Sequence, residues 1–223
     1  GFEFQVLKEM LRRWIAYLCS RLPRTYGLAG FVVCCVLPCR CLERPKEAEV
    51  QVNLGKRQVL LLGLESAGKS TFLWLSEHPT TEILPVEQLP ATQGAKRLTR
   101  KVSVAKGVVE LDLCEVGGSQ TLRQFWHHYV TKETKLICFF MDCTNSNEER
   151  IEETAKAILA LPRKQLLLVA RAHNEVMGAE TLERLHKILR SKGGGHQSLP
   201  VTWWTTSRNS TDMLLKELAE LAT

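Results

Sequence analysis

The sequence lacks an uncharged run long enough to cross a bilayer as a helix, which takes about 20 residues. The uncharged run Thr25–Cys39, for example, has only 15 residues. The body of the chain also lacks an excess of either charge, since residues 58–223 carry 20 Lys and Arg against 19 Asp and Glu. Nucleic-acid-binding domains carry a basic surface, so this balance argues against a nucleic-acid partner.

A regular framework of cysteines is missing as well. Five of the eight cysteines lie before residue 42, and the other three are scattered over the body. This distribution excludes the disulfide scaffold of a small secreted domain. Four cysteines between residues 34 and 41 have no histidine near them, so we favour buried or lipid-facing thiols over a zinc site. Acylation of a membrane-proximal cysteine is an alternative.

Residues 1–42 are predicted to form a helical, hydrophobic extension. Leu7, Leu11, Trp14 and Leu18 recur at spacings of three and four residues, with basic residues on the other side. Such an amphipathic helix either lies in a membrane interface or packs on the protein's own body or on a partner. The uncharged run that follows favours a re-entrant, interfacial or partner-buried segment over a span across a thin membrane. We therefore expect residues 1–42 to bind a membrane or a membrane-protein complex.

The beginning of the chain bears on its location in the cell. Because the chain starts with Gly1 instead of Met, we expect processing, such as removal of a targeting peptide, or a start further upstream. We expect a membrane-associated protein, either in an organellar (mitochondrial) membrane complex or at the cytoplasmic face of an endomembrane. Residues 43–56 are polar and contain a proline, so we interpret them as a linker into a folded domain over residues 57–223.

The most specific motif in the chain is a phosphate-binding loop. A buried parallel strand is predicted over Val59–Leu62 and a helix over Thr71–Ser76. Between them, GLESAGKS fits the eight-position P-loop pattern, whose glycines let backbone N–H groups face phosphate oxygens. We expect Lys69 to bridge the outer phosphates and the Ser70 hydroxyl to ligate Mg²⁺. The predicted nucleotide-binding residues of this loop are Gly63, Glu65, Ser66, Ala67, Gly68, Lys69, Ser70 and Thr71.

A second group of residues is typical of a nucleotide-dependent switch. Alternating apolar residues predict a β-hairpin with strands over Leu98–Val104 and Val108–Glu115. Glu115 begins the sequence EVGG, and a carboxylate at a strand end followed by glycines suits a Mg²⁺-linked switch whose backbone N–H, here that of Gly118, reads a γ-phosphate. Thr92 lies in the loop before the hairpin and is placed to complete the metal shell. The predicted metal ligands are Ser70, Thr92 and Glu115.

The rest of the sequence alternates strands with helices. Strands are predicted over Leu136–Asp142, Gln165–Val169 and Val201–Thr205, and helices over Asn147–Leu161, Thr181–Leu189 and Thr211–Leu221. This alternation predicts an α/β fold of the P-loop NTPase class, with helices on both faces of a mostly parallel sheet. We expect the nucleotide site at the carboxyl ends of the strands.

The sequence resembles the ADP-ribosylation-factor-like (Arf-like) branch of the small GTPases from Gln58 to the C-terminus. The stretches that carry the resemblance are GLESAGKST, PATQG and EVGGSQTLRQFWHHY. It implies a small-GTPase-like fold, an N-terminal amphipathic membrane helix, protein partners at the switch region, and GTP or another nucleoside triphosphate with Mg²⁺ as ligand. It also implies that Glu115 supports the Mg²⁺ through water and that the Gly118 N–H senses the γ-phosphate.

Two departures from the family pattern concern catalysis. The family has an aspartate where this chain has Glu115, which changes the reach of the carboxylate toward the metal. The family's water-positioning glutamine directly follows the paired glycines, where this chain has Ser119, and Gln120 comes one position late. Even with that glutamine, an unassisted small GTPase turns over only about 10⁻⁴–10⁻³ times per second. We therefore expect GTP hydrolysis to be lost or very weak.

A third departure concerns the base. After the strand Gln165–Val169 the family has Asn-Lys-x-Asp, whose lysine covers the guanine and whose aspartate selects it. This chain has RAHN, with Asn174 at the selecting position, and Glu175 replaces the aspartate only if the loop shifts by one residue. Because such hydrogen bonds carry much of the discrimination between substrates, we expect guanine specificity to be lost.

These departures favour a pseudo-GTPase that serves as a membrane-associated interaction or structural subunit of a larger complex, with nucleotide binding retained at the phosphate loop. One alternative is an active GTP-binding switch that needs an external activating partner. Another is a membrane docking protein similar to the beta subunit of the signal-recognition-particle receptor. We interpret His127 and His128 as structural residues, because neither has a matched carboxylate or nucleophile near it in the sequence.

Overall fold

The computed structural model describes residues 52–78, 89–162, 165–173, 175–192 and 199–223. The chain divides into two units, residues 1–50 and 51–223, and only the second is described here as a fold. The predicted extension over residues 1–42 lies outside the described residues. Among the described helices, none has the length and apolarity that a membrane crossing requires.

A six-stranded sheet with the order β2-β3-β1-β4-β5-β6 forms the centre of the fold. Only β2 runs antiparallel, paired with β3, and the remaining neighbours are parallel. This confirms the predicted α/β fold with a mostly parallel sheet. The strands are β1 (Asn53–Gly63), β2 (Ala95–Val104), β3 (Gly107–Val116), β4 (Thr134–Asp142), β5 (Leu166–Arg171) and β6 (Val201–Trp204).

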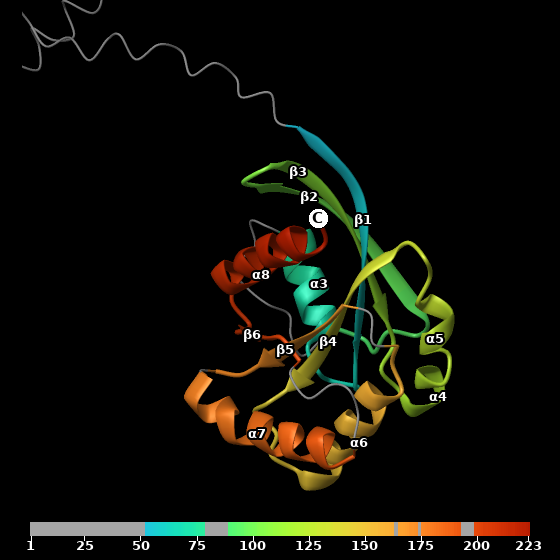
Figure 1. The fold of residues 1–223 in the computed structure, drawn as a ribbon, viewed down its shortest axis with the longest axis vertical. Coiled ribbons are helices and arrows are strands. Elements are labelled where there is room, and N and C mark those ends of the chain that lie inside the picture. Colours follow the sequence, from blue (N-terminus) through green and yellow to red (C-terminus); the bar gives the residue numbers. More distant parts are fainter. Residues whose placement is uncertain (1–51, 79–88, 163–164, 174, 193–198) are drawn as a thin grey trace, which may run out of the picture. The chain divides into compact units, whose positions relative to one another are not determined.

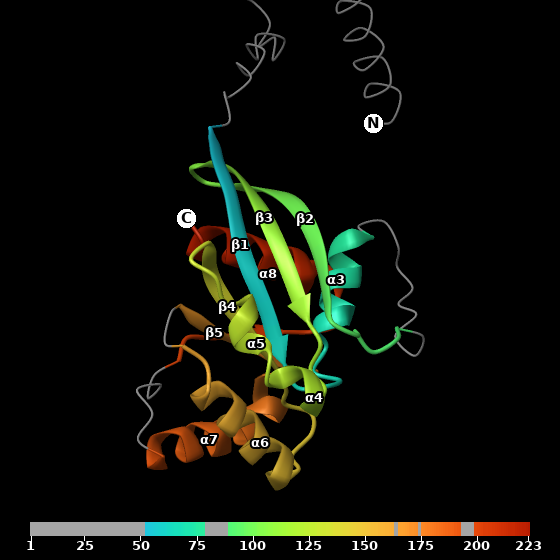
Figure 2. The same ribbon diagram turned by 90° about the vertical axis from the view of Figure 1, so that its right-hand side faces the viewer.

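Helices cover both faces of this sheet (Figures 1 and 2). One face carries α3 and α8, and the other carries α5, α6 and α7, as the two separate apolar cores show. Alternate residues of β1 serve the two cores, because successive side chains of a strand point to opposite faces. The helices are α3 (Lys69–Glu77), α4 (Gln120–Arg123), α5 (Trp126–Tyr129), α6 (Glu148–Leu159), α7 (Glu175–Ser191) and α8 (Arg208–Leu221).

The first strand begins earlier than the sequence pattern indicates. β1 starts at Asn53, inside the segment 43–56 that we predicted as a linker, so the folded domain begins before residue 57. The reason is that Asn53 and Lys56 pair with β3, opposite Val108 and Glu110. The Lys56 ammonium also lies 3.2 Å from the Asp112 carboxylate. These residues are polar because this end of the strand is exposed, and polarity is what made them resemble a linker.

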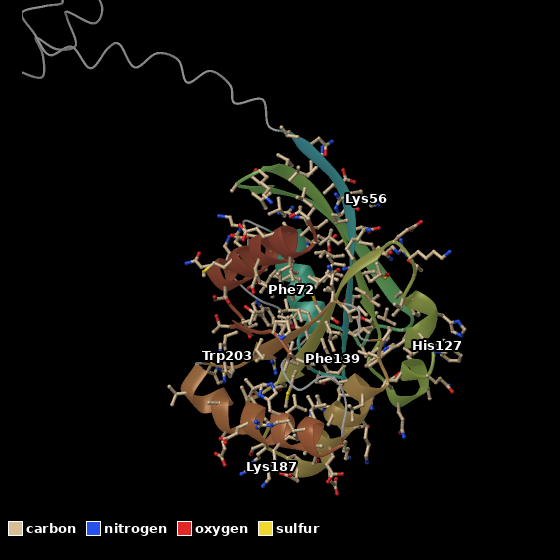
Figure 3. The ribbon with its side chains drawn as sticks, in the orientation of Figure 1. Lys56, Phe72, His127, Phe139, Lys187 and Trp203 are labelled. Carbon is tan, nitrogen blue, oxygen red and sulfur yellow. The ribbon has the colours of Figure 1, made fainter. Side chains whose placement is uncertain are left out.

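The two adjacent tryptophans of β6 face opposite sides of the sheet, because successive side chains of a strand alternate between its faces. Trp204 is fully buried in the core beneath α3 and α8, while Trp203 packs on the other core (Figure 3). The Trp204 ring meets Phe72 and Phe140 edge-on, each with a centroid distance of 5.8 Å. On the far side, α7 begins at Glu175 instead of at the predicted Thr181.

Candidate nucleotide-binding site

The phosphate loop joins β1 to α3 at the carboxyl end of the central strands. A Cβ at Gly63 would lie 2.3 Å from the Phe140 carbonyl oxygen, so only glycine lets the loop leave β1 so close to β4. A Cβ at Gly118 would lie 2.4 Å from the Gly63 carbonyl oxygen, which shows how tightly the segment after β3 packs on the loop. The two predicted glycine-containing motifs therefore lie against each other.

Lys69 is the buried cation of the loop, with 5% of its surface exposed. Its ammonium donates hydrogen bonds to the backbone carbonyls of Gly63 and Leu64, each at 2.8 Å. Burial lowers the pKa of Lys69 to about 8, although the charge of Glu115 works against this shift. These two hydrogen bonds hold the ammonium group over the loop. In this motif, the phosphate oxygens lie at that position.

A cavity of about 300 Å³ opens above the loop. The cavity brings together nearly all the residues that the sequence singled out, from three separate parts of the chain. Gly63 and Gln120 do not line it, and Asn174 lies outside the described residues. The predicted site residues that line it are Glu65, Ser66, Ala67, Gly68, Lys69, Ser70, Thr71, Thr92, Glu115, Gly118 and Ser119.

The three predicted metal ligands converge at one edge of this cavity. A Glu115 carboxylate oxygen accepts hydrogen bonds from the Ser70 hydroxyl and, at 3.0 Å, from the Thr92 hydroxyl. The two hydroxyl oxygens are 3.2 Å apart. The other carboxylate oxygen of Glu115 is buried with no hydrogen-bond partner. Mg²⁺ prefers oxygen ligands of this kind, so the residues fit it, and a bound Mg²⁺ would neutralise charge on the phosphates.

The sequence position at which the Arf-like pattern has its water-positioning glutamine carries a short side chain in this protein. Ser119 lines the cavity, and its hydroxyl oxygen lies 3.2 Å from that of Thr121. Gln120 begins α4 and lines a different groove, together with Trp126 and His127. The rings of His127 and His128 lie 3.9 Å apart between centroids and are tilted by 41°, and both residues are exposed on α5. Within the described residues no cluster of His, Cys, Asp and Glu is arranged to hold a metal.

Comparison with known proteins decides the family. Residues 48–192 match the ADP-ribosylation factor family. The chain belongs to this family.

Individual relatives agree with that assignment. ADP-ribosylation factor-like protein 10 of Mus musculus is 40% identical over 94 residues, which cover 42% of this chain and 35% of that protein. The match thus spans about a third of the mouse protein's length. ADP-ribosylation factor-like protein alp41 of Schizosaccharomyces pombe is 31% identical over 153 residues, covering 66% of this chain and 72% of that protein. In the solved structure of the mammalian SRP receptor, one chain matches with a TM-score of 0.58 and 19% identity, over 74% of this chain and 100% of that chain. At that identity the likeness shows the fold alone.

Arg171 lines the cavity and marks a difference from the Arf family pattern. This residue stands where the pattern has the asparagine of its base motif, and its guanidinium bonds the Asp142 carboxylate at 2.5 Å. The same side chain packs on the phosphate loop, since a Cβ at Gly68 would lie 2.9 Å from it. Although burial works to raise the pKa of Asp142, hydrogen bonds from Thr144 and Arg171 hold it below its usual value. A charged pair therefore occupies the end of β4 and β5.

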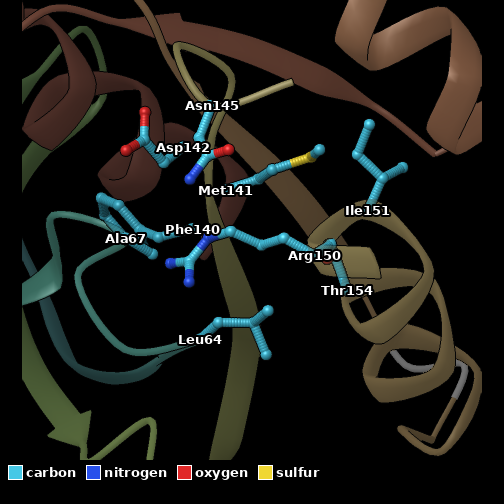
Figure 4. Close-up of a pocket in the computed structure, with 9 residues that line it drawn as sticks. All are labelled: Leu64, Ala67, Phe140, Met141, Asp142, Asn145, Arg150, Ile151 and Thr154. Atoms are coloured by element: carbon cyan, nitrogen blue, oxygen red, sulfur yellow. The ribbon is translucent and has the colours of Figure 1, made fainter. Parts of the chain in front are cut away.

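Two further arginines hold this Arf-family site, and sequence reasoning missed both. Arg150 reaches from α6 to the Glu65 carbonyl of the phosphate loop, along a small pocket between them (Figure 4). Arg123 of α4 donates to the Gly118 carbonyl at 2.8 Å and to the Glu153 carboxylate at 2.5 Å. The partners are mostly far apart in sequence, and no local pattern signals such contacts.

Proposed function

We propose that this Arf-family chain holds a nucleoside triphosphate with Mg²⁺ by its phosphates, hydrolyses it poorly or not at all, and serves as a membrane-associated subunit of a larger complex. The observation that carries the proposal is the composition of the cavity. The loop residues from Glu65 to Thr71 and all three predicted metal ligands line it, whereas Ser119 takes the place of the water-positioning side chain and Gln120 lines another groove.

Partner binding is proposed for the surface around α4 and α5. Phe125 is 46% exposed there, beside the groove that Gln120, Trp126 and His127 help to line. Arg123 links this surface to the segment after β3 through the Gly118 carbonyl. A surface connected in this way to the phosphate site suits a protein that acts by binding a partner and not by catalysing a reaction.

The purified chain is expected to hydrolyse GTP no faster than a Lys69→Ala variant that cannot hold the phosphates. Among the described residues that line the cavity there is no glutamine, the side chain with which the family orients the attacking water in catalysis. Single-turnover release of phosphate, measured with chain in excess over GTP, checks this. Hydrolysis well above that of Lys69→Ala would instead support the active switch with an external activating partner.

Removal of residues 1–49 is expected to release the protein from membranes. The apolar stripe and the basic flanks of residues 1–42 motivate this, since such segments bind membrane interfaces. The measurement is fractionation of cells that express either the whole chain or a variant that begins at Val50. Whole-chain Lys69→Ala is the matched control, and it should remain with the membranes. If the shortened variant fractionates like the whole chain, the membrane role of the extension is wrong.

A further inference from the structure

We propose that Glu115 is a direct ligand of the metal ion, so that the protein holds Mg²⁺ with its own side chains before a nucleotide arrives. The proposal deepens the proposed function at the same site and rests on it for its biological meaning. It differs from the arrangement that the Arf-like resemblance implies, in which the carboxylate at this position acts through water.

The first argument is reach. Glutamate is one methylene longer than aspartate, and here it brings a carboxylate oxygen into contact with both hydroxyls of the predicted metal set. Oxygen ligands on adjacent corners of a Mg²⁺ octahedron are about 3.0 Å apart, given Mg–O distances of about 2.1 Å. The distance from the Thr92 hydroxyl to the Glu115 carboxylate is 3.0 Å, and that from Ser70 to Thr92 is 3.2 Å. The Thr92 hydroxyl oxygen thus lies at the spacing of a neighbouring ligand from both the Ser70 hydroxyl and the Glu115 carboxylate.

The second argument is charge. Glu115 is 1% exposed, and one of its carboxylate oxygens has no hydrogen-bond partner. None of the salt bridges found among the described residues involves it, and the Lys69 ammonium bonds backbone carbonyls instead. Two hydroxyls donate to its other oxygen, but a buried charge remains costly unless it is also paired with an opposite charge. A divalent cation at the converging oxygens supplies that partner.

The third argument is rigidity. Glu115 is the second-to-last residue of β3, and there it pairs with Leu61 of β1 and Lys96 of β2. Strands on both sides fix its backbone, while Ser70 lies in the first turn of α3. A carboxylate held this firmly keeps its position whether or not phosphates are present. The metal site is therefore formed by the fold, with the nucleotide adding ligands to it.

Titration of the whole chain in detergent with Mn²⁺, in the absence of any nucleotide, tests the proposal. Electron paramagnetic resonance of the free ion measures binding. We expect one Mn²⁺ per chain, with Mg²⁺ as a competitor. Glu115→Gln should weaken the binding at least tenfold, and Glu115→Asp should weaken it as well, because the shorter side chain retains the charge but loses the direct contact.

Asp112→Asn is the matched control. Asp112 is a buried carboxylate on the same strand, but it is paired with Lys56 and Arg97 and does not line the cavity. This variant should bind Mn²⁺ like the unaltered chain. If Glu115→Gln fails to fold by circular dichroism, Thr92→Ala takes its place, with an expected loss of at least threefold.

Two outcomes overturn the proposal: no Mn²⁺ bound without nucleotide, or equal binding by the chain and its Glu115 variants. Neither outcome depends on nucleotide binding, which is measured separately. A chain that binds Mn²⁺ but no nucleoside triphosphate would keep this inference and contradict the proposed function. A chain that binds Mn²⁺ only together with nucleotide would contradict this inference and leave the proposed function standing.

Discussion

Trp204→Ala is expected to lower the free energy of unfolding by about 3–5 kcal/mol, the range for truncating a large aromatic side chain in a core. Trp204 is fully buried and meets two other rings edge-on. Its indole N–H also donates to the Thr211 hydroxyl at 3.2 Å, which fixes α8 to the end of β6. Removing the ring leaves a cavity beside Gly68 of the phosphate loop. Stability and nucleotide binding should therefore fall together.

Denaturant unfolding of the whole chain, followed by far-ultraviolet circular dichroism, measures this loss without depending on tryptophan fluorescence. Trp203→Ala is the matched control, because the neighbouring ring is only partly buried and packs on the other face of the sheet. It should cost distinctly less. A loss below about 1 kcal/mol for Trp204→Ala would show that the packing between β6, α3 and α8 does not determine stability.

The second large effect concerns the choice of base: the chain should prefer GTP over ATP by less than a hundredfold. Phosphate contacts are common to both nucleotides, and Lys69 and Ser70 cannot distinguish them. Each lost charge-assisted hydrogen bond is worth about 1.5–3 kcal/mol, and about 1.4 kcal/mol corresponds to a factor of ten. Losing the pair of bonds that an aspartate makes to guanine is therefore enough to remove a hundredfold preference.

Competition binding of GTP and ATP at equal Mg²⁺ measures the preference. The combined variant Arg171→Asn, Ala172→Lys and Asn174→Asp rebuilds the family's base motif, and it should raise the preference for GTP at least a hundredfold. Lys69→Ala should weaken both nucleotides alike. If the unaltered chain already prefers GTP more than a hundredfold, Glu175 or another group has taken over guanine recognition, and the active-switch alternative gains support.

The sequence predicted the structure best where the periodicity of a single strand or helix determines its type and its burial. Val59–Leu62 read as a buried strand, and all four side chains are fully buried. The hairpin and the helices α3, α6, α7 and α8 were likewise anticipated, because their periodicity is local, whereas the single-turn helices α4 and α5 were not. Boundaries were less accurate. Helix α7 extends through Gly178, where a Cβ would lie 2.5 Å from the Trp203 ring. That glycine serves a contact with a distant strand, which no local pattern shows.

For the site, the motif predicted which residues line the cavity but not how their side chains are held. The loop glycines and Lys69 follow from a spacing rule, whereas the bond between Arg171 and Asp142 joins residues 29 positions apart. The contact of Arg150 with Glu65 spans 85 positions. The direct reach of Glu115 to Ser70 depends on a difference of one methylene. Such contacts are properties of the folded arrangement, and a single sequence contains no signal for them.

The position of β1 has a mechanical consequence. It lies between β3 and β4 and is parallel to both, and the N-terminal segment enters the fold at its first residue. A force applied to Asn53 along the strand axis would load the hydrogen bonds of both ladders together in shear, instead of opening them one after another. The opposite end of the same strand is Gly63, where the phosphate loop begins. If residues 1–42 anchor the chain as proposed, tension on them would have to slide the central strand before it could disturb the phosphate loop.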